Sequence, residues 1–182
     1  MKIEALNIDG AFKISPEKIG DERGGFARLY CSEIFKKNAL NTIWLQMNTS
    51  INNQKGIIRG LHYQLMPFQE IKLIRCIRGK VFDVIVDLRK SSKTFGKTVS
   101  LILDSKNLDT VYVPQGCAHG FQTLTNHVEM HYAHSELYNP EYEAGLYYND
   151  PALKIKWPLP VTTISDRDKH HPLLNNIENI IS

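Results

Sequence analysis

Apolar and polar residues alternate in the middle of the chain. Apolar residues fill every second position of Val81–Leu88, with Asp83 and Asp87 standing among them. A period of two predicts a strand, and the preceding run Ile71–Arg78 is also rich in strand-forming residues. Gly79-Lys80 lies between the two runs, so the pattern predicts a β-hairpin.

Further short runs with strand character follow, separated by turn residues such as Pro, Gly, Asn and Ser. They are Thr98–Leu103, Thr110–Val113, Phe121–Leu124 and Val128–Tyr132. Many short strands at roughly ten-residue spacing, without helices between them, favour an antiparallel sandwich or barrel. The chain has 182 residues, so we expect one all-β domain that spans residues 1–182.

Two segments predict helix. Ser32–Leu40 has Ser32 as a candidate cap, an acid in its first turn and lysines later. The tail from Pro172 to Ser182 has isoleucines at 177, 180 and 181, which predict one or two short amphipathic turns.

Charge and cysteine content narrow the classes of protein. Lysine and arginine number 22 against 19 acids, and they are scattered, so a nucleic-acid partner is not expected. No apolar run approaches the roughly 20 residues that span a bilayer, and acids interrupt the N-terminus, so neither a membrane span nor a secretory signal is predicted. Cys31, Cys76 and Cys117 form no CxxC motif; we expect free thiols in a reducing cytoplasm.

His62 and His119 both lie among glycine and apolar residues, where a histidine is either a hydrogen-bonded core residue or a functional base. Their segments resemble the two halves of the cupin signature, the second as Pro114, Gly116, His119 and Asn126. A metal-binding cupin has His-x-His, whereas here Gln64 stands two residues after His62. No metal or other cofactor is therefore expected, although Glu70 and His119 could complete a three-ligand site with His62.

A closer resemblance, to the dTDP-4-dehydrorhamnose 3,5-epimerase family of sugar-nucleotide cupins, covers nearly the whole chain. It implies an all-β jelly-roll (double-stranded β-helix) barrel with short peripheral helices. The matching segments are Asp21–Phe26, Gln46–Ser50, Gly56–Gln64, Lys72–Arg75, Val81–Arg89, Thr94–Gly96, Tyr138–Glu141, Asn149–Pro151, Ile155–Pro158 and Ile164–Asp168.

The resemblance implies an isomerase that epimerises C3 and C5 of a dTDP-4-keto-6-deoxyhexose, in dTDP-rhamnose or related deoxysugar biosynthesis. Such a reaction removes a proton next to a ketone, holds an enolate and returns a proton to the opposite face. In the family's pattern His62 is the base, Asp168 orients it, Tyr132 is the acid on the other face and Lys72 is the cation near the C4 oxygen.

The residues alone leave other interpretations open. Asp168 could be one charge of a solvated loop, and Tyr132 shares a strand face with Val128 and Met130, which favours core packing. Lys72 points away from its apolar neighbours. Such a lysine is ordinary on the outer face of a barrel, and inside it needs an anionic partner.

The resemblance also implies a substrate site and a homodimer whose subunits share the nucleotide pocket. Arginines suit a diphosphate because their planar fork pairs with two oxygens. The chain departs from the family at Arg28, Ala133 and Leu137. The implied substrate-binding residues are Arg23, Gln46, Asn48, Arg59, His119, Glu143 and Arg167.

Three alternative functions remain at this point. One is an epimerase acting at C3 or C5 only, or a 3,4-ketoisomerase, on a related dTDP-keto sugar. Another is a sugar-nucleotide-binding cupin without activity, and the third is a metal-dependent cupin such as a dioxygenase. The departures at Arg28, Ala133 and Leu137 bear on which sugar and nucleotide are preferred.

Overall fold

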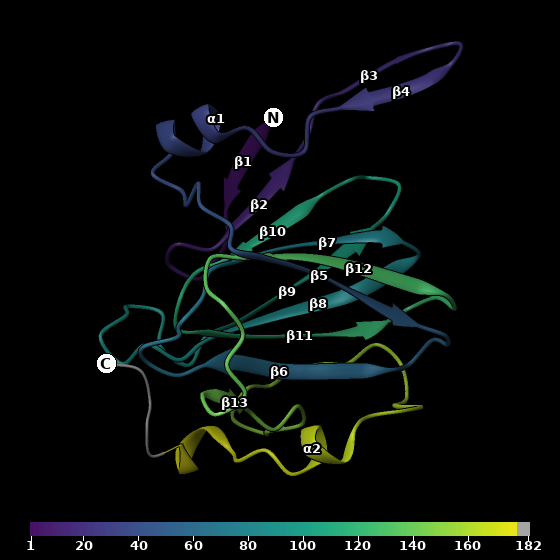
Figure 1. Ribbon diagram of the computed structural model, residues 1–182. Helices are drawn as coiled ribbons and strands as arrows, with labels where there is room; N and C mark the ends of the chain where they lie inside the picture. The colour runs from purple at the N-terminus through teal and green to yellow at the C-terminus, as the bar shows by residue number, and fades with distance from the viewer. Residues whose placement is uncertain (178–182) are drawn as a thin grey trace.

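Two antiparallel sheets face each other and form the body of the protein (Figure 1). The computed structural model describes residues 1–177. The six-stranded sheet has the order β1 (Lys2–Ala5), β2 (Phe12–Ser15), β10 (Thr110–Val113), β7 (Lys72–Arg78), β12 (Val128–His134) and β5 (Gln46–Asn52). The five-stranded sheet has the order β13 (Glu143–Gly145), β6 (Ile58–Gln64), β11 (Cys117–Thr123), β8 (Lys80–Asp87) and β9 (Thr98–Asp104).

The remaining elements are short and peripheral. A separate hairpin of β3 (Lys18–Asp21) and β4 (Gly24–Ala27) projects from the body at the top of Figure 1. The helices are α1 (Ser32–Lys37), α2 (Asp166–Lys169) and one 3₁₀ turn at Leu174–Asn176. The predicted all-β antiparallel barrel is confirmed. No helix within residues 1–177 is long and apolar enough to cross a membrane.

The core lies between the two sheets. Ile74 and Met130 of the six-stranded sheet pack there with Ile85 and Phe121 of the five-stranded sheet, all at most 2% exposed. Burial of a large apolar side chain contributes about 1.5–3 kcal/mol. This layer therefore holds the sheets together and fixes which residues face each other across the barrel.

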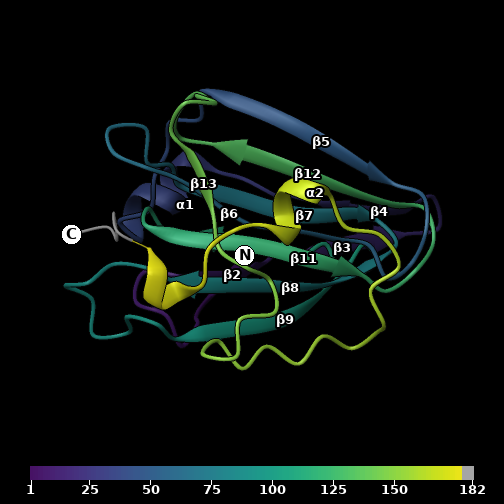
Figure 2. The same ribbon diagram turned by 90° about the horizontal axis from the view of Figure 1, so that it is seen from below.

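The outer face of each sheet is covered as well. The C-terminal segment, with Leu146 and Leu153, packs against Val84 and Val86 of β8 (Figure 2). On the other side α1 places Phe35 against the six-stranded sheet. Because the alternate apolar residues of β8 meet this outer layer, Asp83 lies on the inner side, fully buried. The alternation of residues in β8 therefore distinguishes its inner face from its outer face, and both faces are buried.

The predicted hairpin at Gly79-Lys80 is wrong. The strands β7 and β8 have the expected positions, but β7 pairs with β10 and β12, whereas β8 pairs with β9 and β11. The turn at Gly79, whose φ is 79°, leads the chain from one sheet to the facing one. A local turn signal does not distinguish a hairpin from such a corner, because both need the same reversal of direction.

The helix predictions need smaller corrections. Helix α1 ends at Lys37, and its cap is Cys31 with no side-chain hydrogen bond, so Ser32 is the first helical residue. In the tail only Leu174–Asn176 is helical among the described residues. The predicted turns around Ile180 and Ile181 lie outside the described part of the chain.

Candidate active site

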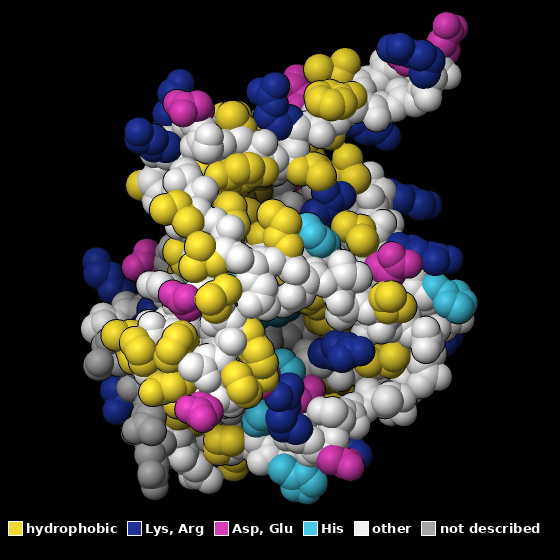
Figure 3. Space-filling view, in the orientation of Figure 1, with side chains coloured by type: hydrophobic (Ala, Val, Ile, Leu, Met, Phe, Trp, Pro, Cys, Tyr) yellow, Lys and Arg dark blue, Asp and Glu magenta, His cyan; other side chains and the backbone are white. Residues whose placement is uncertain are grey.

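A polar pocket opens between the two sheets. In Figure 3 it is the hollow in the lower half of the face, with histidine and basic side chains at its border. Side chains of both sheets and of the C-terminal segment line it. They are Gln46, Asn48, Thr49, Ser50, Arg59, His62, Tyr63, Gln64, Glu70, Lys72, His119, Phe121, Tyr132, His134, Tyr138, Glu143 and Arg167.

His62 and Asp168 form a hydrogen-bonded pair on the wall of the five-stranded sheet. His62 Nε2 lies 2.8 Å from Asp168 Oδ1, although 106 residues separate them in the sequence. The Asp168 carboxylate is buried and accepts a second bond at Oδ2 from the Gly60 N–H, at 3.0 Å. Ser165 caps α2 by accepting from the Asp168 N–H, so the helix start fixes where this carboxylate points.

Asp168 keeps its negative charge in this setting. Burial raises the pKa of its carboxyl, but the nearby His171 ring and the bonds from His62 and the Gly60 N–H outweigh that effect and hold the pKa well below its usual range. An ionised carboxylate only accepts hydrogen bonds, so His62 carries its proton on Nε2. The lone pair is then on Nδ1, the ring nitrogen suited to take a proton from a ligand in the pocket.

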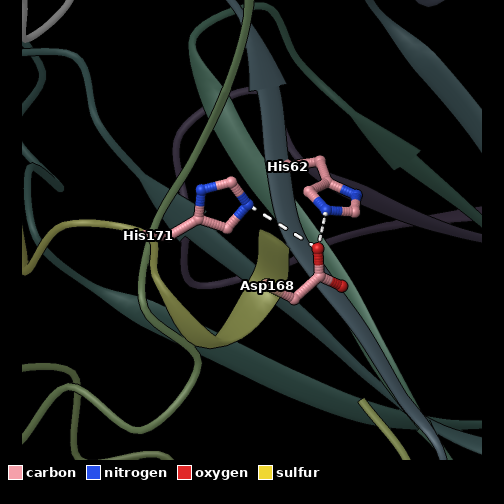
Figure 4. Close-up of side chains that lie close together, drawn as sticks. All are labelled: His62, Asp168 and His171. Carbon is pink, nitrogen blue, oxygen red and sulfur yellow. Dashed lines mark hydrogen bonds and ion pairs between the residues drawn. The ribbon is translucent and has the colours of Figure 1, made fainter. Parts of the chain in front are cut away.

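His171 is a third member of this group, and the sequence analysis missed it. Its Nε2 lies 3.7 Å from Asp168 Oδ1, and its ring stands edge-on to that of His62 (Figure 4). The ring sits over Gly145, where any larger residue would overlap it. The signal was available: His171 follows Asp168 by three residues, a spacing that brings side chains together at a helix end.

Tyr132 lies on the other wall. It belongs to β12 in the six-stranded sheet, packs against the core between the sheets, and also lines the pocket. Its hydroxyl is 3.1 Å from Ser50 Oγ. Burial raises the pKa of this hydroxyl well above its ordinary value, even though the Ser50 bond lowers it. The two interpretations of Tyr132 are thus compatible, with the ring in the core and a protonated hydroxyl at the pocket.

Lys72 points into the barrel and has an anionic partner there. Its Nζ lies 3.0 Å from Glu70 Oε1 and 3.2 Å from the His62 carbonyl oxygen. Glu70 Oε2 accepts from Gln64 Nε2 at 2.8 Å and lies 3.4 Å from His134 Nδ1. Sequence reasoning raised Glu70 only as a metal ligand, but the structure makes it the counter-ion that lets a lysine be buried.

We expect this ion pair to make stability depend on pH. Burial raises the pKa of Glu70, but Lys72 and His134 outweigh that effect and lower it from 4.5 to about 2. The unfolded chain therefore takes up the proton first as pH falls. The stabilisation is complete above pH 4.5, amounts to about 3 kcal/mol, and disappears as pH approaches 2.

Urea unfolding of the wild type and Glu70→Gln between pH 7 and pH 3 checks this. At pH 7 the variant should be less stable by about 3 kcal/mol, and the difference should shrink as pH falls below the ordinary value of 4.5. A difference that stays constant over this range would show that the Glu70 charge contributes nothing.

His119 has a partner of its own. Its Nε2 lies 2.8 Å from Asp83 Oδ2, and both side chains are buried. Glu70 is likewise occupied by Lys72 and Gln64, so the three-ligand set of His62, Glu70 and His119 considered from the sequence is not assembled. Within residues 1–177, one set of potential metal ligands is close together: His62, Asp168 and His171, whose ligand atoms lie within 4.8 Å of one another.

Six of the seven predicted substrate-binding residues line the pocket. Arg59 donates from Nε to Asn52 Oδ1 at 2.7 Å, and Arg167 is paired with Glu143 at the rim. The exception is Arg23, which lies in the β3–β4 hairpin, exposed and paired with Asp21. The residues that line the pocket are Gln46, Asn48, Arg59, His119, Glu143 and Arg167.

None of the three departures from the family pattern lines the pocket. Ala133 is buried under α1 on the outer face of the six-stranded sheet. Leu137 is 54% exposed, and Tyr138 beside it lines the pocket and donates to Glu143 Oε2 at 2.6 Å. Arg28 lies near Glu17, away from the pocket. The four predicted catalytic residues, His62, Asp168, Tyr132 and Lys72, are all present despite these three departures.

Comparisons with known proteins point to one family. The sequence profile of the family dTDP-4-dehydrorhamnose 3,5-epimerase matches residues 5–176. A dTDP-4-dehydrorhamnose 3,5-epimerase of Sinorhizobium fredii is 41% identical over 175 residues, which are 96% of this chain and 90% of the relative.

Solved structures show the same fold. The epimerase of Legionella pneumophila, in complex with dTDP-4-keto-L-rhamnose, superposes with a TM-score of 0.91 at 38% identity and covers 97% of this chain and 94% of its own. A 3'-monoepimerase of Streptomyces bikiniensis, in complex with dTDP-quinovose, gives 0.88 at 32% identity over 94% and 87%. Double and single epimerases therefore share this architecture.

Proposed function

The chain belongs to the dTDP-4-dehydrorhamnose 3,5-epimerase family, and from this premise we propose how its pocket performs the reaction. The substrate is dTDP-4-dehydro-6-deoxy-D-glucose and the product is dTDP-4-dehydro-L-rhamnose. One observation carries the proposal: a histidine base and a tyrosine hydroxyl line the same pocket from opposite sheets.

His62 is the base. C3 and C5 both neighbour the C4 ketone, so their hydrogens are acidic enough to be removed as protons when the enolate is stabilised. His62 Nδ1 takes the proton, and the ring becomes an imidazolium that the ionised Asp168 carboxylate stabilises through Nε2–H. Asp168 is thus a positioning residue that also stabilises the charged form of the ring by its hydrogen bond.

Tyr132 is the acid. A proton returned from the six-stranded sheet reaches the face of the sugar ring opposite to His62, and this inverts the carbon. Burial keeps the hydroxyl protonated at neutral pH, so it can donate as soon as an enolate carbon lies beside it. The phenolate then takes a proton from solvent and the His62 imidazolium releases one to solvent, so both groups are restored before the next inversion.

Lys72 and the arginines supply positive charge. The Lys72 ammonium, fixed between Glu70 and the His62 carbonyl, stabilises the enolate oxygen at C4. Arg59 and Arg167 reach the pocket from β6 and α2 and hold the diphosphate. No step of this scheme needs a cofactor.

A homodimer completes the site in this proposal. The edge strand β5 exposes Met47 and Ile51, 64% and 66% exposed, and the β3–β4 hairpin exposes Ile19 and Phe26. Apolar side chains gathered on a surface mark an interaction site. A partner subunit bound there would receive Arg23 of the hairpin in its nucleotide pocket.

Analytical ultracentrifugation tests the dimer. We expect the protein to sediment with twice the 20.8 kDa mass of one chain. Sedimentation with the mass of a single chain would contradict the dimer.

The state of the cysteines supports a cytoplasmic location. Cys31, Cys76 and Cys117 are all free, and Cys76 and Cys117 are buried. Three unpaired thiols suit a reducing compartment, so we place the reaction in the cytoplasm.

The proposed function is tested by incubating the purified protein with dTDP-4-dehydro-6-deoxy-D-glucose and following the sugar by proton NMR. Inversion at both C3 and C5 is expected. Inversion at C3 alone would make the protein a monoepimerase, and a ketone moved to C3 would make it a ketoisomerase. An unchanged sugar that is nevertheless bound would leave only a binding function.

A further inference from the structure

The group of His62, Asp168 and His171 has the geometry of a metal site. Figure 4 shows both imidazoles turned toward one carboxylate oxygen, Asp168 Oδ1. The distances from this oxygen are 2.8 Å to His62 Nε2 and 3.7 Å to His171 Nε2, and all three atoms lie within 4.8 Å of one another.

We propose that these three side chains bind a zinc ion, which inhibits the epimerase reversibly. Two imidazoles and one carboxylate form a common zinc ligand set, with bonds of about 2.0–2.2 Å. Ligand atoms on a tetrahedral ion of that size are roughly 3.3 Å apart. The observed 2.8 Å and 3.7 Å lie on either side of this value, and the three ligand atoms lie within 4.8 Å of one another, so movements of the two rings bring all three onto one ion.

His171 is what distinguishes this group from an ordinary His–Asp pair. Its Nε2 is buried and has no hydrogen-bond partner among the described residues. Its side chain is 12% exposed and occupies the space that the missing side chain of Gly145 leaves. Nothing in the reaction scheme uses this nitrogen. His171 Nε2 points toward the Asp168 carboxylate, which also bonds the His62 ring, so this nitrogen can serve as the third ligand of a metal ion.

The surrounding residues hold the carboxylate in place for a cation. The Gly60 N–H fixes Asp168 Oδ2, which leaves Oδ1 toward the two rings. Such outer contacts orient metal ligands and support affinity. The Arg167 guanidinium lies 3.8 Å from Oδ1, but it is half-exposed and its charge is paired with Glu143.

Zinc at this site removes the base. The ion takes the Nε2 lone pair of each imidazole, so the proton of neutral His62 moves from Nε2 to Nδ1. No lone pair then remains on His62 to accept a proton from the sugar. The inhibition rests on the proposed role of His62, whereas the binding of zinc does not.

Calorimetric titration of the intact, chelator-treated protein with zinc chloride tests the binding. One zinc ion per chain is expected for the wild type, and His171→Leu should weaken the affinity by at least about 10- to 100-fold. His170→Leu is the matched control, because the neighbouring His170 is exposed and bonds the Asp166 carbonyl; it should bind as the wild type does. Equal affinity in wild type and His171→Leu, or no binding by the wild type, would overturn the site.

A second variant tests the site even if His171→Leu fails to fold. Gly145→Ala changes no ligand but places a methyl group where the His171 ring lies, and it should also weaken zinc binding. In the epimerase assay zinc should inhibit the wild type, and a chelator should restore the activity. If zinc binds as expected but the metal-free protein shows no epimerase activity, the proposed function fails and the site stands. If zinc raises the activity, the inhibitory role is wrong.

Discussion

Replacing His62 by asparagine is expected to abolish epimerisation. No other base is proposed on the wall formed by the five-stranded sheet, where Asp168 holds the imidazole at 2.8 Å. A positioned general base contributes about 10²–10⁴-fold, so the loss in kcat should be at least of that order. The substrate should also stop exchanging its C3 and C5 hydrogens with solvent, because removal of the proton comes first.

The fold should survive this change. Asp168 keeps its bond from the Gly60 N–H and its contact with His171, so the carboxylate stays partnered. His170→Asn is the matched control, since it removes an exposed imidazole outside the pocket. Activity of His62→Asn within about tenfold of the control would mean that His62 is not the base.

Replacing Tyr132 by phenylalanine should separate the two halves of the reaction. The change removes only the hydroxyl that lies 3.1 Å from Ser50 Oγ, and the ring remains in the core. His62 can still break the C–H bond, but protonation from the opposite face fails. We expect epimerised product to fall by about 10²–10⁴-fold, while exchange of substrate hydrogen with solvent falls much less.

Tyr112→Phe is the control for this experiment. Tyr112 lies in β10 of the same sheet and its hydroxyl is also partly buried, but it accepts from the Asn41 N–H outside the pocket. Both variants lose one hydrogen-bonded hydroxyl, which costs about 1 kcal/mol of stability. If exchange and epimerisation slow equally in Tyr132→Phe, Tyr132 positions the substrate or the core and is not the acid.

The strands of the central region could be predicted from their apolar pattern, and their pairing could not. Thr110–Val113 matches β10 residue for residue, because a fully buried short strand is a continuous run of β-branched and aromatic residues. The pairing of β7 and β8 depends on which sheet each joins, and this depends on the packing of the whole core cluster between the sheets, to which Ile74 and Ile85 contribute from opposite sides. No local pattern records that contact.

Strands with polar or glycine-containing sequences were not predicted from periodicity. In β5 the polar side chains of Gln46, Asn48 and Ser50 line the pocket, whereas the apolar Met47 and Ile51 are exposed, so the apolar positions do not mark the core. In β6 the chain passes Gly120 so closely that residue 60 has no room for a side chain, and Gly60 has a φ of 116°. Both segments bear pocket residues. Their departure from a regular strand pattern reflects the site they build.

Some contacts of the site residues could likewise be predicted from the sequence, and others could not. Lys72 could be assigned to the inside of the barrel only once Glu70 was seen beside it. The closeness of His62 and Asp168 came from the resemblance, since 106 residues separate them. The contact of His171 with His62 and the Asp83 partner of His119 came only from the structure, because each contact joins elements that no spacing rule relates.

The central claim is that one pocket removes and returns protons at both carbons next to the ketone. Incubation of the wild-type protein with dTDP-4-dehydro-6-deoxy-D-glucose in heavy water, followed by NMR of the isolated product, tests it most directly. We expect deuterium at both C3 and C5 of an L-configured sugar, because every returned proton comes from a solvent-exchanged donor. Deuterium at C3 alone, or a product that keeps its original hydrogen at both carbons, would contradict the claim.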